Sequence, residues 1–259
     1  MKTDNRTLAT CLEHEWADLL FPERCISAAD FLRDPTRGRG RFIPSPFYAA
    51  AADYARMCFA AEHATFRRVI EIGGATGRFC HEWLGGATIP THYTLSDPAP
   101  EKIDLAEWLL ADGGPREIPV NSSQLRVTRE TVTPPAGARI PAIHQLDFAI
   151  RTAEDPAWQN PAADFLVCLN VTDHTADPTQ FIESLRRLLR PGGYALIASP
   201  LDWMSDYTPP ALWKDDMAQL FGGGWSLMAQ TDLPFYHRSR PRRLIVFSSQ
   251  LIIAQRIGS

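Results

Sequence analysis

Hydrophobic positions along this chain change repeatedly between helix-like and strand-like spacing. Apolar side chains recur at helical spacing within residues 8–33, and the alanine-rich segment 47–67 favours a second helix. Beyond it, apolar runs typical of buried strands alternate with further helical segments. The expected strands cover residues 69–72, 92–96, 142–146, 165–170 and 194–199, and the expected helices begin near residue 77 and cover residues 100–111 and 178–189.

This alternation predicts an α/β fold in which a mainly parallel sheet carries helices on both faces. Apolar runs within residues 225–257 predict two closing strands, arranged as an antiparallel hairpin. Residues 113–139 are rich in Pro, Gly, Ser and Thr and are expected to form an irregular insertion. We therefore expect one large domain over residues 47–259, preceded by a helical extension or lid over residues 1–46.

The charge balance limits the partners that the chain is expected to bind. With 26 Lys and Arg against 30 Asp and Glu, the net charge is −4, so no basic field attracts nucleic acid or an anionic membrane. The first residues are charged where a signal peptide needs an apolar stretch, and no apolar run reaches the length of a membrane span, which favours a cytoplasmic location. The oligomeric state is not indicated.

The five cysteines and seven histidines show neither disulfide nor metal-ligand spacing. We therefore expect reduced thiols and no metal site.

A glycine-rich segment follows the first expected strand of the sheet. It contains Glu71, Gly73, Gly74 and Gly77. Glycines at the carboxyl end of a buried strand let the backbone approach a ligand closely, which predicts a nucleotide-like ligand. A dinucleotide pattern beginning at Gly73 requires glycines at two positions that Ala75 and Arg78 occupy. A nicotinamide cofactor is therefore disfavoured.

The segment instead resembles motif I of class I S-adenosylmethionine-dependent methyltransferases, which places Glu71 near the methionine amino end of S-adenosyl-L-methionine. The resemblance implies a Rossmann-like sheet with an antiparallel C-terminal strand. It also covers the run from Leu185 to Tyr194, whose L-x-P-G-G pattern precedes the fifth strand in this class.

The same resemblance assigns further cofactor-binding residues. Asp97 ends the second expected strand, where its carboxylate can accept both ribose hydroxyls. Asp147 is expected to end the third strand and accept the adenine amino group, with Phe148 against the ring. Ser96 and Pro98 are expected to line the pocket.

The fourth expected strand ends in Asn170, with Asp173 three residues later. This strand end resembles that of protein-histidine N-methyltransferases and of the methyltransferase domain of ovothiol biosynthesis. The resemblance implies an imidazole acceptor in histidine, a thiohistidine or a histidine-containing peptide. Asp173 is expected to bond the ring N–H and so select the tautomer, while Asn170 orients the ring and borders the cofactor. Trp203 and Phe235, in further matching patches, are expected to roof the pocket.

Two other functions remain open from the sequence. His174 stands where the resembled enzymes tend to have arginine, and it is a candidate general base for a small-molecule hydroxyl or thiol acceptor. A cofactor-binding regulator without catalysis is the other alternative. The basic cluster at residues 238–243 is expected to be a solvated turn, with binding of an anionic substrate group as the second interpretation.

Overall fold

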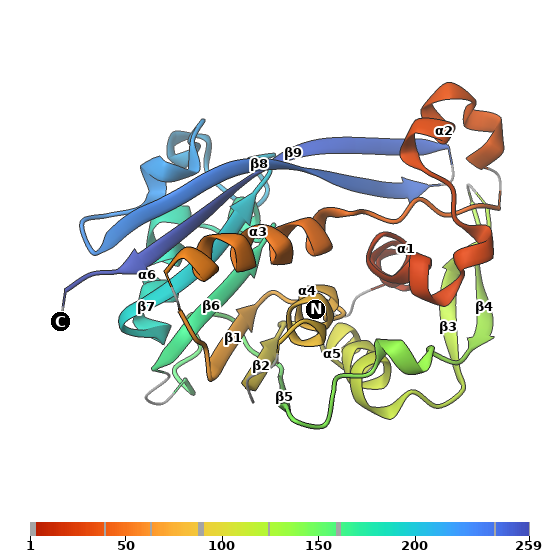
Figure 1. Cartoon of the computed structure of the whole chain (residues 1–259). Coiled ribbons are helices and arrows are strands. Elements are labelled where there is room, and N and C mark those ends of the chain that lie inside the picture. The colour runs from red at the N-terminus through yellow and green to blue at the C-terminus, as the bar shows by residue number, and fades with distance from the viewer. Residues whose placement is uncertain are drawn as a thin grey trace.

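The computed structural model describes residues 4–38, 40–62, 64–87, 91–123, 125–158, 162–240 and 242–258 (Figure 1). The helices are α1 (Asn5–Leu20), α2 (Ala28–Arg33), α3 (Phe47–Ala61), α4 (Arg78–Gly85), α5 (Pro100–Glu107) and α6 (Pro178–Leu188). The strands are β1 (Arg68–Ile72), β2 (His92–Ser96), β3 (Arg116–Asn121), β4 (Val127–Val132), β5 (Gln145–Ala149), β6 (Ala163–Leu169), β7 (Leu189–Ser199), β8 (Trp225–Arg240) and β9 (Arg243–Arg256). Short 3-10 turns include Thr172–His174, and a π-helical turn, Trp108–Asp112, continues α5.

A seven-stranded sheet with the order β5-β2-β1-β6-β7-β9-β8 forms the centre of the molecule. The strands from β5 to β7 are parallel, whereas β9 runs antiparallel to both of its neighbours. The expected mainly parallel Rossmann-like sheet and the closing antiparallel hairpin are therefore confirmed. Because parallel strands share a carboxyl edge, the segments that follow β1, β2 and β6 meet at one edge of the sheet.

A separate apolar cluster covers each face of the sheet. The larger cluster packs α1, α3, α4 and α5 against one face, and the smaller one packs α6 against the other. Figure 1 shows α3 lying along the long β8–β9 hairpin and α1 below it, and both helices contact β8. Residues before position 47 enter the larger cluster through Leu12, Trp16 and Phe42, so the N-terminal helix is built into the same core.

Local sequence signals explain where the helices beside the site begin. Asp177 caps α6, accepting a hydrogen bond from the Gln180 amide, and Pro178 occupies the first turn. Gly77 precedes α4 with a φ of 84°, in the left-handed region that favours glycine. An added Cβ at Gly77 would also lie 2.7 Å from Leu110. The glycine is therefore required where the loop turns into α4.

Residues 113–139 are not the irregular insertion expected from their composition. Strands β3 and β4 form an antiparallel ribbon, and Ile118 and Val120 on β3 are buried in the larger cluster. β3 also contacts α1. Burial of these apolar side chains against α1 compensates for the turn-forming residues around them, a tertiary effect that local composition does not reveal.

The basic cluster at residues 238–243 is only partly the expected solvated turn. Arg242 and Arg243 are exposed at the hairpin tip, but Arg238 is 1% exposed. Its guanidinium forms an ion pair with Glu13 of α1 at 2.6 Å and donates to the carbonyl oxygens of Arg41 and Gly38. Arg238 thus joins the hairpin to α1 and to the loop before α3.

Among the described residues, no helix has the length and apolar character needed to cross a membrane.

We predict that Arg238→Ala lowers the free energy of unfolding by about 3–5 kcal/mol, because it leaves the buried Glu13 carboxylate without its charge partner. Urea titration followed by circular dichroism measures this loss. Arg242→Ala is the matched control, since this side chain is exposed on the same hairpin, and we expect its effect to stay within about 0.5 kcal/mol. Equal stability of the two variants would contradict a structural role for the buried pair.

Candidate active site

The glycine-rich segment forms a tight loop at the carboxyl end of β1. The Gly74 amide donates to the Ser96 carbonyl at the end of β2 at 2.9 Å, which draws the loop against the neighbouring strand. An added Cβ at Gly74 would lie 2.8 Å from the Glu71 carboxyl carbon, and one at Gly73, whose φ is 70°, would meet Val171. The loop therefore keeps its backbone close to Glu71 only because these positions lack side chains.

Glu71 lies beneath this loop and is 2% exposed. Its Oε2 accepts a hydrogen bond from the Tyr93 hydroxyl at 2.8 Å. The pKa of Glu71 is raised to about 8, chiefly by burial and in part by the nearby carboxylates of Glu15 and Asp97, while the Tyr93 hydrogen bond opposes the rise. A carboxyl group with this pKa is protonated at neutral pH and ionises readily when a cation arrives.

Asp97 lies directly after β2 and is 3% exposed. One carboxylate oxygen accepts from the Ala75 amide of the glycine loop at 3.2 Å, and the other accepts from the Ala99 amide at 2.9 Å. Lys102 of α5 lies 3.5 Å from the same carboxylate. The Ser96 hydroxyl beside it is buried with no hydrogen-bond partner, whereas Pro98 is exposed. Asp97 and Ser96 thus border the loop, and their contacts with the cofactor stay a prediction.

Helix α1 supplies residues to this site that sequence reasoning missed. The Glu15 carboxylate accepts from the Thr76 amide at 3.3 Å and from the Thr76 hydroxyl. The Trp16 indole N–H donates to that hydroxyl oxygen at 3.0 Å. Arg78, which begins α4, donates to the Glu15 carbonyl and pairs with Asp18 of α1. No local motif around Glu15 marks these contacts, because its partner lies 61 residues away in the sequence.

The third strand departs from the sequence-based expectation. Asp147 lies in the middle of β5, opposite Thr94, and not at the strand end, because β5 extends to Ala149. Its carboxylate contacts His92 Nε2 at 2.5 Å and remains about half exposed. Phe148 packs against the larger apolar cluster. The expected position of Asp147 is therefore corrected, and its side chain is directed toward His92, at the beginning of β2.

Asn170 follows β6 in an unusual backbone conformation for a residue with a side chain. Its φ is 55°, and its amide N–H donates to the Ala198 carbonyl at 2.8 Å. The Ser249 hydroxyl of β9 donates to Asn170 Oδ1 at 2.5 Å, while Asn170 Nδ2 is buried without a partner. The oxygen of this amide is therefore held by Ser249, and its NH₂ group has no hydrogen-bond partner. A strained residue at a strand end is typical of functional sites.

Asp173 and Asn170 are held by serines on different strands, β7 and β9 respectively. Asp173 is 1% exposed, and Ser199 of β7 donates to its Oδ1 at 3.0 Å. Burial raises the pKa of Asp173. His174, the next residue, is exposed and lies edge-on to Tyr207, with ring centroids 5.0 Å apart.

The two aromatic residues expected to roof the pocket lie on opposite faces of the sheet. Trp203 packs against the smaller apolar cluster and donates its indole N–H to the Lys214 carbonyl at 2.8 Å, which holds the loop after β7. Phe235 belongs to the larger cluster, on the side of α1 and the glycine loop. Phe235, and not Trp203, therefore lies on the side of the cofactor residues.

Phe235 belongs to an aromatic and imidazole group on the inner face of the β8–β9 hairpin. The His14 ring of α1 lies edge-on to Phe235 at 5.4 Å and 5.8 Å from the His237 ring, and Phe247 stacks on Phe235 at 6.2 Å. The pKa of His237 is lowered to about 4, chiefly by burial and in part by repulsion from nearby His14, Arg243 and His174. His237 is therefore neutral at physiological pH and keeps a lone pair on its ring.

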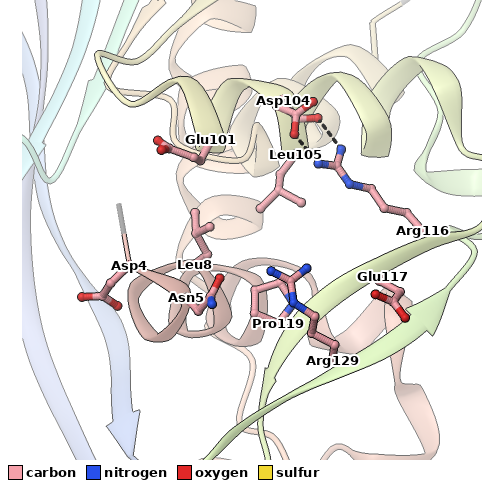
Figure 2. Close-up of a pocket in the computed structure, with 10 residues that line it drawn as sticks. All are labelled: Asp4, Asn5, Leu8, Glu101, Asp104, Leu105, Arg116, Glu117, Pro119 and Arg129. Carbon is pink, nitrogen blue, oxygen red and sulfur yellow. Dashed lines mark hydrogen bonds and ion pairs between the residues drawn. The ribbon is translucent and has the colours of Figure 1, made fainter. Parts of the chain in front are cut away.

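A separate cavity of about 520 Å³ lies between α1, α5 and the β3–β4 ribbon (Figure 2). Arg116 on its wall is paired with Asp104, and Arg129 and Glu117 also face the cavity. Its lining includes neither the glycine loop nor the end of β6. This cavity is therefore not the candidate active site.

Within the part of the chain that the structure describes, no group of three or more His, Cys, Asp or Glu side chains is placed to hold a metal ion.

Three features together define a Rossmann-like methyltransferase. They are the strand order, the glycine loop after β1, and Asp97 after the neighbouring strand β2. Comparison with known families agrees: residues 45–244 match a family described as a methyltransferase domain, and the chain belongs to that family. It is an S-adenosylmethionine-dependent methyltransferase. The residues present fit this cofactor, since buried Glu71 and Asp97 face a loop that a Cβ would obstruct. Family membership replaces the alternative of a regulator without catalysis.

Curated relatives match short regions. The chain is 36% identical over 56 residues to the ubiquinone biosynthesis O-methyltransferase of Vibrio atlanticus, which covers 21% of this chain and 24% of that protein. It is 32% identical over 88 residues to the protein of the same description from Cereibacter sphaeroides, covering 34% of this chain and 30% of the other. The chain thus matches about a quarter to a third of the length of these relatives.

Solved structures share the fold at low identity. The N-methyltransferase NodS of Bradyrhizobium japonicum, in complex with S-adenosyl-L-homocysteine, aligns with a TM-score of 0.50 and 12% identity over 81% of this chain and 86% of that one. The [4+2]-cyclase SpnF aligns with a TM-score of 0.52 and 11% identity over 82% of this chain and 81% of that one. These likenesses show the fold and leave the acceptor open.

We predict that cofactor affinity rises with pH up to about 8, because the ammonium group that S-adenosylmethionine and S-adenosylhomocysteine share binds best when Glu71 is ionised. Below that pKa, binding releases a proton, and the dissociation constant is expected to fall by up to about tenfold per pH unit. Calorimetric titration with S-adenosylhomocysteine between pH 6.5 and 8.5, in buffers of different ionisation enthalpy, measures both the affinity and the proton release.

The control for this pH dependence is Glu71→Gln, which keeps the shape of the side chain but cannot ionise. The variant should bind more weakly at pH 8.5 and lose most of the dependence on pH. A wild-type affinity that does not change with pH would contradict the assignment.

Proposed function

We propose that the chain methylates a ring nitrogen of an imidazole in a small molecule or peptide. The free end of the Asn170 amide is the observation that carries this proposal, since a buried polar group without a partner is costly unless a ligand satisfies it. It lies at the carboxyl edge of the sheet, where ligands of open α/β sheets bind.

The Ser249–Asn170 contact leaves this amide two ways to meet an acceptor ring. A serine hydroxyl can donate or accept, so the amide can present either its NH₂ group or its carbonyl oxygen to the ligand. The carbonyl orientation accepts the N–H of a neutral imidazole and so fixes the tautomer whose other nitrogen carries the lone pair. Asp173, which uses one oxygen for Ser199, is proposed to support the positive charge that develops on the ring.

Positioning supplies most of the catalysis in this reaction. S-adenosylmethionine, when bound, supplies an electrophilic methyl group on a sulfonium, and the acceptor lone pair must lie in line with the bond that breaks. A neutral imidazole nitrogen needs no base for this step. We propose that Phe235 and Phe247, on the inner face of the hairpin, contact the flat acceptor ring, while Asn170 sets its orientation.

A hydroxyl acceptor is the second candidate, and a different observation favours it. A hydroxyl must lose its proton during transfer, and His237 is a buried, neutral imidazole next to Phe235 whose ring nitrogen can accept that proton, as a weak base because of its low pKa. The O-methyltransferase relatives are in keeping with this chemistry. His174, the base that the sequence suggested for a hydroxyl or thiol, is exposed beside Tyr207, so we rank it below His237.

An acceptor panel tests the two candidates directly. Purified protein is incubated with methyl-labelled cofactor and with histidine, a thiohistidine, a histidine-containing dipeptide and a catechol, and the methylated atom is located by NMR. We expect label on a ring nitrogen of at least one imidazole compound. Transfer to the catechol alone would contradict the imidazole proposal and favour the hydroxyl candidate.

Two substitutions separate the candidates by mechanism. We predict that Asn170→Ala lowers kcat/KM for the imidazole acceptor by about 100-fold, because it removes a hydrogen bond that positions the ring. His237→Gln should change that rate by less than about threefold, whereas it should cost at least about 100-fold if the acceptor is a hydroxyl. Steady-state kinetics of both variants, with folding checked by circular dichroism, gives the answer.

A further inference from the structure

Glu15 places a carboxylate beside the cofactor loop from outside the methyltransferase sheet. Its side chain belongs to α1, is 2% exposed and accepts hydrogen bonds from the Thr76 amide and hydroxyl. The following residue, Trp16, bonds to the same threonine hydroxyl. The position of this carboxylate is therefore fixed relative to the loop.

Three buried carboxyl groups surround the cofactor loop, and the His14 imidazole lies 3.6 Å from the carboxylate of Glu15. Glu15, Glu71 and Asp97 are all 3% exposed or less. The negative charges of Glu15 and Asp97 both raise the pKa of Glu71. Lys102 is the cation that pairs with Asp97. The nearby Arg78 guanidinium is already matched by Asp18 and Glu82.

Other groups respond to the same negative charge. Glu15 contributes to raising the pKa of the Cys11 thiol and of the Tyr48 hydroxyl, in both cases after the larger effect of burial. A buried excess of negative charge is unfavourable unless a cation compensates it. The cluster therefore avoids an excess of negative charge only while Glu71 stays protonated, and a positively charged ligand allows all three carboxyl groups to ionise.

The cofactor and its demethylated product differ by one positive charge at the sulfur atom. S-adenosylmethionine carries a positive sulfonium, whereas S-adenosylhomocysteine has a neutral thioether and otherwise the same groups. A fixed negative charge near the sulfur therefore favours the first over the second, while hydrogen bonds to the shared groups favour both equally.

We propose that Glu15 is a specificity-determining residue that makes this site prefer the sulfonium cofactor over the demethylated product. The glycine loop and the strand-end acids recognise what the two ligands share, and the carboxylate carried by α1 adds the charge-dependent part. Methyl transfer then weakens the attraction between the ligand and α1 at the moment when the product must leave.

Glu15→Gln tests this proposal by binding alone. The variant keeps the shape of the side chain and an oxygen that can accept from Thr76, but it removes the charge. Calorimetric dissociation constants are measured for S-adenosylmethionine, for S-adenosylhomocysteine and for sinefungin, whose amine-bearing carbon replaces the sulfonium. We expect the preference for the two cationic ligands over the neutral one to fall by about tenfold, the size expected for one charge at intermediate distance in a protein interior.

Thr76→Ala is the matched control. It removes the hydroxyl that holds Glu15 and Trp16 but leaves every charge in place, so it should weaken all three ligands by a similar factor. If Glu15→Gln also weakens all three equally, Glu15 only holds α1 in place and the proposal is overturned. A change in preference caused by Thr76→Ala as large as that of Glu15→Gln would overturn it as well. Thermal melts of both variants confirm that they are folded.

Discussion

The parallel pairing of β1 with β2 and β6 is the constraint on which the rest of the structure depends. Ile72 of β1 lies opposite Ser96 of β2 on one side and Cys168 of β6 on the other. The three strands therefore end at the same level of the sheet. Glu71, Asp97 and Asn170 are far apart in the sequence but reach one edge for this reason. Every contact of the candidate site begins from this register, because a one-residue slip would turn each side chain to the opposite face.

Helix α1 adds to this edge a group that the sheet alone does not provide. Its Glu15 bonds to Thr76, and two residues earlier Glu13 pairs with Arg238 of the hairpin. The same helix therefore contacts both the cofactor loop and the β8–β9 hairpin. Burying these charges is favourable only because each has hydrogen-bond partners in the fold, so the helix position is specified by polar contacts as well as by apolar packing.

The β8–β9 hairpin contributes the proposed acceptor side of the site. Ser249 fixes the Asn170 amide, and Phe235 and His237 lie on the same inner face beside His14. The Asn170 amide, which can orient a ring, favours an imidazole acceptor. The His237 imidazole, which can remove a proton, favours a hydroxyl acceptor. The two candidate reactions therefore differ in which of these side chains contributes most to the rate, and not in how the cofactor is bound.

The sequence by itself determined the sheet, its antiparallel closing hairpin and the loop from Glu71 to Gly77, because strand and helix periodicity and glycine placement are local properties of the chain. Local signals were insufficient at Asp147, where β5 extends beyond the expected end, and in residues 113–139, where burial against α1 produces a ribbon. They also gave no indication that Arg238 is buried or that Glu15 reaches the cofactor loop. Only the tertiary structure decided these contacts, since they join segments 61 to 225 residues apart, and a pairing at that distance depends on packing and charge.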